Sequence, residues 1–434
     1  MSGELLKQVR VLDPESGRDQ VADVLIADGR IRAVESAIAD YPENTRVRDG
    51  GGLILGPGLV DLYSHTGEPG FEERETLESL GKAAIAGGFT RLGILPDTVP
   101  PADNPATVGF LQSRVPAGFH LWGAMTRGAA GEQMTELGEL AGSGIVGFAD
   151  GHPLQRLTLL RRILEYLHPL NVPIALYCCD RQLASNGVMR EGDESIYAGL
   201  PGLPGFAETA ALAAVLELLE ATGTPVHIMR VSTARGVELI RDAKRRGLPI
   251  TASTTWMHLL FDTEAVSGKR WRVLGSDGSP SSPFPIPYDP SLNLDPPLGN
   301  PADRAALIAG VGEGILDAIA VDHAPHTYEE KTVAFADTPP GAIGLELALP
   351  LLWETFVATE KWSPLQLWRA LSTAPARCWQ QTPPSLQIDR PAELTLFDPR
   401  QRWTVNGTTI QSRSANTPWW GQELTGRVVE TWGA

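Results

Sequence analysis

Residues 59–95 read LVDLYSHTGEPGFEERETLESLGKAAIAGGFTRLGIL and contain the unit that decides the fold. A short apolar run, Leu59–Tyr63, is followed by the helix-like segment Thr76–Gly87 and then by a second apolar run, Arg91–Leu95. Continuous apolar runs of this length are typical of strands that are buried on both faces of a parallel sheet. A strand, a helix and a second parallel strand form one β-α-β unit, so this stretch predicts an α/β fold.

The same alternation of apolar runs and helix-like segments continues along most of the chain. Eight strand-like runs can be identified, and eight strands that alternate with helices predict a (β/α)₈ barrel of the TIM type. The predicted strands are Leu59–Tyr63, Arg91–Leu95, His120–Ala124, Ile145–Phe148, Pro173–Tyr177, Val226–Arg230, Pro249–Ser253 and Ala318–Asp322, and the predicted helices include Thr76–Gly87, Leu157–Leu167, Ala207–Thr222, Arg235–Arg246 and Ala302–Val311.

The two ends of the chain show a different pattern, in which short strands are separated by turns. Strands from both ends of one chain can pair with each other. We therefore expect residues 1–55 and 388–434 to form one small β-sandwich beside a barrel of residues 56–387. The strands expected there are Gln8–Leu12, Val24–Ala27, Arg30–Val34, Glu393–Phe397, Trp403–Val405 and Gly426–Thr431.

The charge balance limits the classes of partner. The 434 residues include 36 Lys plus Arg and 52 Asp plus Glu, so the formal net charge is −16. Apolar residues make up 42% and charged residues 20%, which is typical of a folded soluble protein rather than a disordered one. Binding to phosphates needs clustered Lys and Arg, so we expect neither a nucleic acid nor an anionic membrane as the main partner.

The apolar stretches and the cysteines of the sequence bear on the cellular location of the protein. The N-terminal residues contain no apolar signal segment, and apolar stretches such as Leu53–Val60 are too short to span a membrane. The three cysteines, Cys178, Cys179 and Cys378, offer neither a disulfide framework nor a CxxC zinc motif. We therefore expect a cytoplasmic protein that does not associate with membranes.

Candidate functional residues follow from the predicted barrel, because reacting side chains in such barrels lie at the C-terminal ends of the strands. His65 follows the first predicted strand and Asp322 ends the last, and their convergence at the barrel mouth suggests a metal site. A catalytic zinc ion normally has three protein ligands and a water molecule. The candidate ligands are His65, Asp150 and Asp322. The alternative, in which His65 is a hydrogen-bonded structural residue, stays open.

A series of motifs in a fixed order spans nearly the whole chain. They are Gly56–Asp61 leading to His65, Glu68–Glu72, Ala86–Thr90, Val231–Ala234, Asp295–Leu298, Asp322–Thr327, Gly341–Leu349, and Asn416–Pro418 with Gly421. In these motifs the chain resembles the dihydroorotases of the amidohydrolase superfamily. The resemblance implies a barrel with a β-sandwich. It also implies hydrolysis and closure of the dihydroorotate ring in pyrimidine synthesis, with one or two zinc ions.

Most of the metal-binding positions that the resemblance implies hold other residues. The first strand of the family ends in Asp-x-His-x-His, and here the two histidine positions are Tyr63 and His65. Two further metal-binding histidines of the family correspond to Tyr177 and Arg230. The metal-bridging aspartate resembles Asp150, although one residue of its motif is missing. The resemblance makes Asp322 the catalytic base.

The positions that hold substrate in the family are changed as well. Its substrate arginine corresponds to Gly67, and the asparagine that helps to hold the substrate carboxylate corresponds to Asp97. Its Asn-Pro-Pro-Leu-Arg stretch begins here with Asp295 and ends with Gly299. His326 is retained and matches a histidine near the substrate. We expect these exchanges to weaken the binding of an anionic substrate.

The exchanged residues are poor ligands for zinc. A tyrosine phenol has an ordinary pKa near 10, and it is a poor zinc ligand while it is protonated. An arginine is always charged and has no free lone pair, so at position 230 it would repel a metal ion. We expect Arg230 to form a bidentate ion pair with Asp322 or Asp150 in place of the metal.

These exchanges favour a divergent, non-catalytic dihydroorotase-like protein that needs no cofactor. The resemblance then implies a role as a structural partner of aspartate carbamoyltransferase. Two alternatives stay open. One is an active amidohydrolase with a single zinc ion on His65, Asp150 and Asp322, and the other is a sensor that binds a ligand without chemistry. A homodimer is a reasonable expectation for the oligomeric state.

Overall fold

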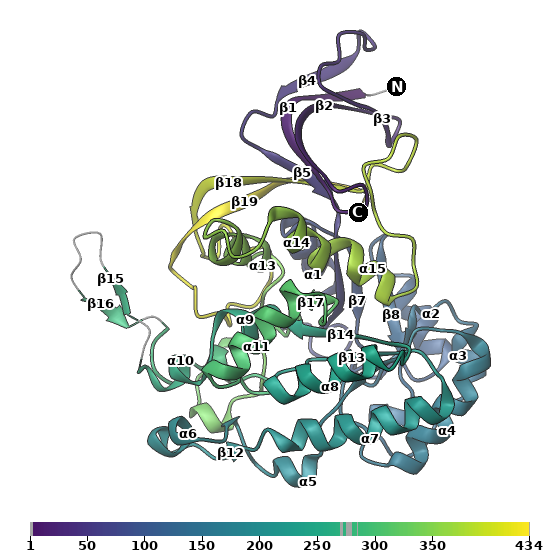
Figure 1. Cartoon of the computed structure of the whole chain (residues 1–434), viewed down its shortest axis with the longest axis vertical. Helices are drawn as coiled ribbons and strands as arrows, with labels where there is room; N and C mark the ends of the chain where they lie inside the picture. Colours follow the sequence, from purple (N-terminus) through teal and green to yellow (C-terminus); the bar gives the residue numbers. More distant parts are fainter. Residues whose placement is uncertain (1–2, 270–271, 275–279, 284, 434) are drawn as a thin grey trace.

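The computed structural model describes residues 3–269, 272–274, 280–283 and 285–433. Within these residues a barrel of parallel strands is surrounded by helices, and a second sheet lies at one end of the barrel (Figure 1). The predicted α/β barrel with additional strands from both ends of the chain is confirmed.

Eight parallel strands of the described chain form the barrel, in two four-stranded sheets ordered β6-β7-β8-β9 and β10-β13-β14-β17. A parallel bridge between Phe148 and Ile174 joins the two sheets on one side. On the other side, the His65 amide donates to the His323 carbonyl at 2.8 Å and closes the ring. The strands are β6 (Leu59–Ser64), β7 (Phe89–Ile94), β8 (Phe119–Gly123), β9 (Gly147–Phe148), β10 (Ala175–Tyr177), β13 (Val226–Met229), β14 (Ile250–Thr255) and β17 (Ala318–Ala320).

Four barrel strands end earlier than the sequence predicts, and in two of them the backbone explains the early end. The expected strands Val226–Arg230 and Ala318–Asp322 stop at Met229 and Ala320. Arg230 and Asp322 have φ values of 55° and 54°, which lie in the left-handed region, so neither residue can continue an extended strand. Both residues line the pocket at the barrel mouth.

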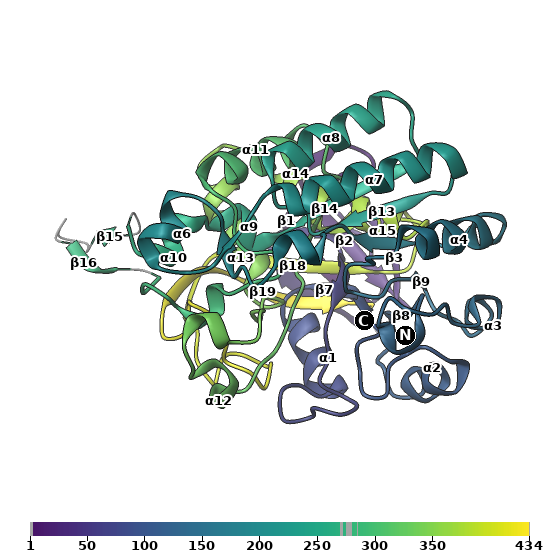
Figure 2. The same cartoon turned by 90° about the horizontal axis from the view of Figure 1, so that it is seen from below.

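The helices outside the barrel bury one apolar face each. In α4 the buried residues Leu160, Ile163, Leu164 and Leu167 repeat at helical spacing. Figure 2 shows α7, α8 and α11 side by side along one side of the strands. The longer helices are α1 (Leu77–Ala86), α2 (Pro105–Gln112), α4 (Leu157–Leu167), α7 (Phe206–Thr222), α8 (Ala234–Arg245) and α11 (Pro301–Gly312). None of the described helices is long and apolar enough to cross a membrane.

Shorter elements lie in the connections. They are α3 (Leu137–Ala141), α5 (Arg181–Ala184), β11 (Met189–Arg190), α6 (Asp193–Ala198), β12 (Gly202–Leu203), α9 (Trp256–Leu260), α10 (Thr263–Ser267), β15 (Arg272–Leu274), β16 (Pro280–Pro283), α12 (Tyr328–Lys331), α13 (Ala348–Leu352), α14 (Pro364–Trp368) and α15 (Ala374–Cys378).

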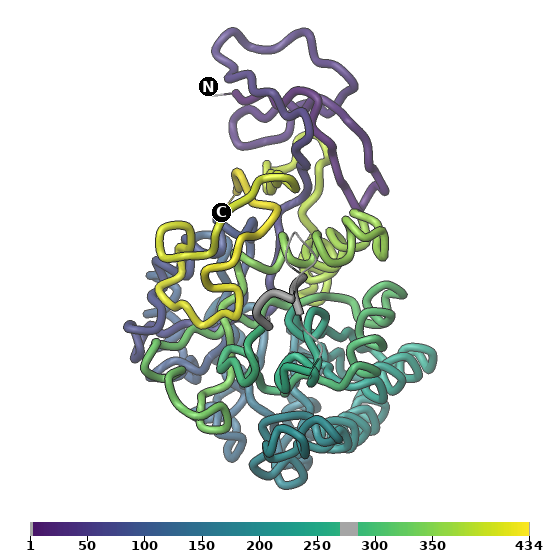
Figure 3. Tube along the Cα trace, turned by 90° about the vertical axis from the view of Figure 1, so that its left-hand side faces the viewer, coloured from purple at the N-terminus to yellow at the C-terminus, as the bar shows by residue number. Residues whose placement is uncertain are grey.

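Strands from both ends of the chain form one seven-stranded sheet, ordered β19-β18-β5-β1-β2-β3 with β4 on β1. Antiparallel pairing of β18 with β5 joins the two ends, and Leu396 lies opposite Leu55. Figure 3 shows the C-terminal strands between the N-terminal strands and the barrel. The division after residue 55 stays a prediction, and β5 crosses it. The strands are β1 (Gly3–Asp13), β2 (Arg18–Ala27), β3 (Arg30–Glu35), β4 (Thr45–Asp49), β5 (Ile54–Pro57), β18 (Leu394–Thr404) and β19 (Glu423–Trp432).

Candidate functional site

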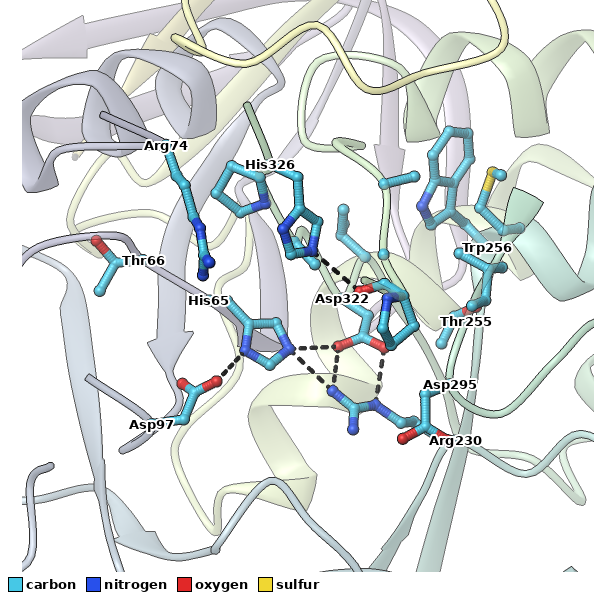
Figure 4. A pocket seen from close by; sticks show the side chains of 18 of the residues that line it. His65, Thr66, Arg74, Asp97, Arg230, Thr255, Trp256, Asp295, Asp322 and His326 are labelled. Atoms are coloured by element: carbon cyan, nitrogen blue, oxygen red, sulfur yellow. Dashed lines mark hydrogen bonds and ion pairs between the residues drawn. The ribbon is translucent and has the colours of Figure 1, made fainter. Parts of the chain in front are cut away.

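A pocket of about 190 Å³ opens at the C-terminal ends of the barrel strands (Figure 4). His65 follows β6, Arg230 follows β13 and Asp322 lies two residues beyond β17, so three strands bring these side chains together. The site predicted from the strand ends therefore corresponds to a real cavity, and His65 and Asp322 both line it.

An ion pair between Arg230 and Asp322 occupies this region of the pocket. The guanidinium donates from Nε to Oδ2 at 2.8 Å and from Nη2 to Oδ1 at 2.6 Å, so the contact is bidentate. The two side chains are 5% and 15% exposed. Burial alone would raise the pKa of Asp322, but the charges and hydrogen bonds of Arg230 and His65 together outweigh it and hold the pKa far below its ordinary value. Of the two partners expected for Arg230, the structure has Asp322.

Arg230 contacts both Tyr63 and Tyr177, the other two residues that the resemblance implies at metal-binding positions. The Arg230 guanidinium lies 5.7 Å from the ring centre of Tyr63 and 5.3 Å from that of Tyr177, within range of cation–π attraction. The Tyr63 hydroxyl accepts from the Arg230 amide at 3.1 Å and lies 2.9 Å from Ser253 Oγ. Burial is the main reason that the pKa values of both phenols are raised. Both tyrosines are therefore neutral packing partners of the arginine rather than anionic ligands.

His65 connects the ion pair to a second carboxylate. Its Nδ1 lies 2.6 Å from Asp97 Oδ2, while Nε2 lies 3.5 Å from Asp322 Oδ1 and 3.0 Å from Arg230 Nη2. Burial lowers the pKa of His65, but the charges of Asp97 and Asp322 outweigh it and raise the pKa to about 9. Each ring nitrogen of His65 thus lies near a carboxylate, and Nε2, at 3.0 Å from Arg230 Nη2, accepts from the guanidinium when the ring is neutral.

Asp150 is held away from this network. Its Oδ1 accepts from the amides of Met125 and Thr126 at 2.7 and 3.1 Å, and its Oδ2 accepts from the Thr126 hydroxyl at 2.7 Å. Burial raises its pKa to about 6. Asp150 is 2% exposed and does not line the pocket. The structure thus brings together His65 and Asp322 of the expected ligand set, while Asp150, which follows β9, is held by the loop that follows β8.

The donor set at the barrel mouth does not fit a zinc ion. In the described part of the chain, no three His, Cys, Asp or Glu side chains are placed to hold one metal. Both oxygens of Asp322 are engaged by a guanidinium, which carries a positive charge and offers no lone pair. A divalent cation between them would have to displace Arg230 and accept its repulsion.

Asp295 and His326 also line the pocket, and each has its own partners. Asp295 Oδ1 accepts from the Tyr177 hydroxyl at 2.6 Å, and its carboxylate forms an ion pair with Arg181. His326 Nε2 lies 3.1 Å from the Pro340 carbonyl and donates to it. Asp97 and Asp295 therefore bring no unpaired negative charge to the pocket, since His65 and Arg181 balance them.

Comparison with known proteins places the chain in a family. The family model described as Dihydro-orotase-like matches residues 51–235. A protein of Synechocystis sp. named "Probable dihydroorotase-like protein" is 46% identical over 454 aligned residues, which cover 99% of each chain. The chain belongs to the dihydroorotase family. A protein of Pelotomaculum thermopropionicum named "Dihydroorotase" is 37% identical over 426 residues, which cover 97% of this chain and 95% of that one.

Solved structures support the fold of this dihydroorotase-family chain. The L-hydantoinase (dihydropyrimidinase) of Arthrobacter aurescens superposes with a TM-score of 0.82 at 22% identity and covers 99% of this chain and 96% of its own. The D-hydantoinase of Thermus sp. superposes with a TM-score of 0.77 at 21% identity, over 98% and 93% of the two chains. These likenesses show that the chain has the barrel fold of the amidohydrolases.

Gly67 and Gly299, which the resemblance implies at substrate-binding positions, are tightly enclosed. A Cβ atom on Gly67 would lie 2.1 Å from the Phe71 carbonyl oxygen and 2.6 Å from that of Glu75. A Cβ on Gly299 would lie 2.5 Å from Asp303 Cβ and 2.9 Å from the Ser232 carbonyl oxygen. A side chain at either position would therefore require neighbouring atoms to shift.

Sequence reasoning missed one arginine that lines the pocket and one that pairs with a pocket residue. Arg74 lines the pocket and donates from Nε to Glu330 at 3.0 Å, and Arg181 pairs with Asp295. Arg74 lies just after the family motif Glu68–Glu72, and this position could have indicated that it lies at the site. Arg181 lies four residues after Tyr177, and no motif next to it could have indicated its role.

Proposed function

We propose that this dihydroorotase-like chain is a non-catalytic protein of pyrimidine biosynthesis that acts as a structural partner of aspartate carbamoyltransferase. The observation that supports the loss of catalysis is the bidentate ion pair between Arg230 and Asp322. The resemblance to the family makes Asp322 the base of the reaction, and in this chain both of its oxygens are engaged. A general base must be free to take a proton from the attacking group.

The protonation equilibrium of Asp322 argues in the same direction. Arg230 and His65 together hold its pKa far below the ordinary value, against the opposing effect of burial. A base is most effective when its pKa lies near the working pH, so Asp322 is a weak proton acceptor at neutral pH. Members of this family typically depend on metal, and metal binding lowers the pKa of a bound water from 15.7 to about 7. With neither group available, we expect no measurable turnover of dihydroorotate.

The partner role is supported by apolar side chains that stay exposed on adjoining elements. Ile196 and Tyr197 on α6 are 79% and 68% exposed. Tyr288 is 42% exposed, and its hydroxyl donates to the Ala198 carbonyl at the end of α6 at 3.1 Å. Adjoining exposed apolar residues mark protein contacts more often than isolated ones do. We assign aspartate carbamoyltransferase as the partner from the family resemblance.

The experiment that tests the partner role is sedimentation of the purified chain with aspartate carbamoyltransferase of the same organism. We expect a discrete complex of defined stoichiometry. Ile196→Asp should weaken it, while Ile388→Asp, at a residue that is 61% exposed elsewhere on the molecule, should leave it unchanged. Independent sedimentation of the two proteins at concentrations well above those in a cell would refute the partnership.

The alternative function is an active hydrolase with a reduced, single-metal site. The separation of 3.5 Å between His65 Nε2 and Asp322 Oδ1 favours it, because both groups are potential ligands. This function requires that Arg230 leaves Asp322 when zinc binds. Zinc titration followed by an amidase assay on several cyclic amides tests it, and turnover that depends on added zinc would establish it.

We propose further that the chain acts in the cytoplasm and engages neither nucleic acid nor membrane, in keeping with a formal net charge of −16. We also propose that it is a homodimer, which light scattering of the isolated chain tests.

A further inference from the structure

A network of hydrogen bonds leads from the backbone of Arg230 to buried side chains of the barrel. The Arg230 amide donates to the Tyr63 hydroxyl oxygen at 3.1 Å, and this oxygen lies 2.9 Å from Ser253 Oγ. Ser253 Oγ lies 2.8 Å from His227 Nε2, and His227 Nδ1 lies 2.9 Å from Thr251 Oγ1. The network joins three barrel strands, since Tyr63 belongs to β6, His227 to β13, and Ser253 and Thr251 to β14.

The central side chains of this network are shielded from solvent. Tyr63 and Ser253 are fully buried, and His227 is 3% exposed. A buried donor or acceptor that lacks a partner is unfavourable, because water does not replace the missing hydrogen bond. Burial, with a smaller contribution from the Lys244 charge, lowers the pKa of His227 to about 3. The ring is therefore neutral at pH 7, so one nitrogen carries a proton and the other carries a lone pair.

The partners of Tyr63 decide the direction of the hydrogen bonds. Its oxygen accepts from the Arg230 amide, and in the part of the chain that the structure describes Ser253 Oγ is the only acceptor for its own proton. Ser253 in turn donates its proton to His227 Nε2, so Nδ1 carries the ring proton and donates to Thr251 Oγ1. The reverse direction would leave the buried Tyr63 proton without an acceptor.

The backbone of Arg230 depends on this hydroxyl oxygen. Arg230 has φ 55°, in the left-handed region that is unfavourable for a residue with a side chain. The hydrogen bond from its amide to Tyr63 stabilises this conformation. From the same backbone position, Nε and Nη2 of Arg230 reach the two oxygens of Asp322 at 2.8 and 2.6 Å. The orientation of the Tyr63 hydroxyl therefore bears on the placement of the guanidinium.

We propose that His227 is a positioning residue for the ion pair between Arg230 and Asp322. Its ring is neutral, with the proton on Nδ1, and its Nε2 accepts from Ser253. This acceptor directs the protons of the network so that the Tyr63 oxygen faces the Arg230 amide. In the described residues His227 hydrogen-bonds to neither member of the ion pair, so it acts through Ser253 and Tyr63. The role goes beyond the proposed function, since it holds whether or not the chain hydrolyses an amide.

The tautomer of His227 tests the proposal on the unmodified chain. Nitrogen-15 nuclear magnetic resonance of histidine-labelled protein at pH 7 distinguishes a protonated ring nitrogen from one with a lone pair. Comparison with His227→Gln assigns the signals among the 8 histidines. We expect the proton on Nδ1 and the lone pair on Nε2. A proton on Nε2 would overturn the proposal, because Ser253 would then accept from the ring and donate toward Tyr63.

Two substitutions of His227 test its effect on Arg230. His227→Phe keeps a ring but removes the acceptor, so the amide and Nε hydrogens of Arg230 should exchange with solvent about ten-fold faster. In His227→Gln the side-chain oxygen replaces Nε2 as the acceptor, and exchange should stay slow. His120→Phe is the matched control and should leave Arg230 unchanged, because His120 is a half-buried residue of β8 whose ring packs 5.4 Å from that of Trp379.

These exchange rates can overturn the positioning role in two ways. One is equal exchange of Arg230 in folded His227→Phe and in the control. The other is equally fast exchange in His227→Gln and His227→Phe, because the loss would then come from packing rather than from the acceptor. Circular dichroism and the urea midpoint establish that each variant is folded.

Ser253→Ala keeps the proposal testable if His227→Phe does not fold. It interrupts the network between Tyr63 and His227 and should speed Arg230 exchange about ten-fold as well, and unchanged exchange would overturn the role. A dihydroorotate assay of the parent chain separates this proposal from the proposed function. Turnover would contradict the non-catalytic function alone, whereas the opposite tautomer of His227 would contradict the positioning role alone.

Discussion

Replacement of Arg230 by methionine should remove the cation that balances a buried carboxylate. The guanidinium donates to both Asp322 oxygens at 2.6 and 2.8 Å and to the Gly151 carbonyl at 2.8 Å, and all three hydrogen bonds are lost in Arg230→Met. Removal of one partner from a buried ion pair typically costs about 3–5 kcal/mol, because the other charge is left uncompensated. We expect the free energy of unfolding at pH 7 to fall by about this amount.

Two further variants assign the loss to the ion pair. In Arg230→Met with Asp322→Asn the buried charge is gone, so most of the lost stability should return. Asparagine is suitable at position 322 because the backbone there has φ 54°, a conformation that Asn tolerates better than most residues. Arg230→Lys keeps the charge but loses the bidentate geometry, and should fall between the parent and Arg230→Met.

The effect depends on pH in a defined direction. In the parent chain the pKa of Asp322 is lowered below its unfolded value, so its stabilising contribution is present above the unfolded pKa of about 3.9 and is lost as the pH falls through the folded pKa. In Arg230→Met the carboxylate can relieve the penalty by binding a proton. The difference between the two chains should therefore be largest near pH 7 and should shrink below about pH 4.

The assay is reversible urea unfolding followed by the fluorescence of the 11 tryptophans. A difference between parent and Arg230→Met of less than about 0.5 kcal/mol at pH 7, which is the range of ordinary surface substitutions, would refute the reasoning. A large loss of stability in Arg230→Met that the added Asp322→Asn change does not restore would also refute the reasoning. The loss would then come from packing rather than from charge.

Three further sets of substitutions each predict a result that can be measured on one purified variant. Gly67→Arg should lower the urea midpoint and gain no affinity for dihydroorotate, because its Cβ would lie 2.1 Å from a carbonyl oxygen; a gain in affinity would contradict this. Tyr63→His, Tyr177→His and Arg230→His combined should gain zinc affinity in isothermal titration, and a folded triple variant that binds no zinc would show that the site lacks more than its ligands. Asn416→Ala should speed hydrogen exchange in residues 322–341, since its side chain donates to two carbonyls of that segment at 2.9 and 3.1 Å; unchanged exchange would exclude this role.

The barrel could be predicted from the sequence because its strands are buried on both faces and stand out as apolar runs. Four predicted strands were too long at their ends, and in two of them Arg230 and Asp322 adopt left-handed backbone conformations. No apolar pattern reports such a conformation, because it depends on the contacts of the side chain with the rest of the barrel mouth. Strand pairing between the two chain ends followed from their shared pattern of short strands and turns.

The candidate site was predicted in part. His65 and Asp322 meet because both follow barrel strands, which is a consequence of the fold alone. Asp150 also follows a strand, but hydrogen bonds from Met125 and Thr126 hold its carboxylate elsewhere. Arg181 was missed because its partner is 114 residues away in the sequence, and only the folded chain brings them together.

The most direct test of the central claim, that Arg230 and Asp322 have replaced the metal chemistry of the family, is zinc content measured together with dihydroorotate hydrolysis. The purified chain is equilibrated with zinc, freed of unbound metal and divided between elemental analysis and the assay, with an active dihydroorotase as the positive control. We predict far less than stoichiometric zinc and no turnover above the buffer blank. Stoichiometric zinc with measurable hydrolysis of dihydroorotate would contradict the claim.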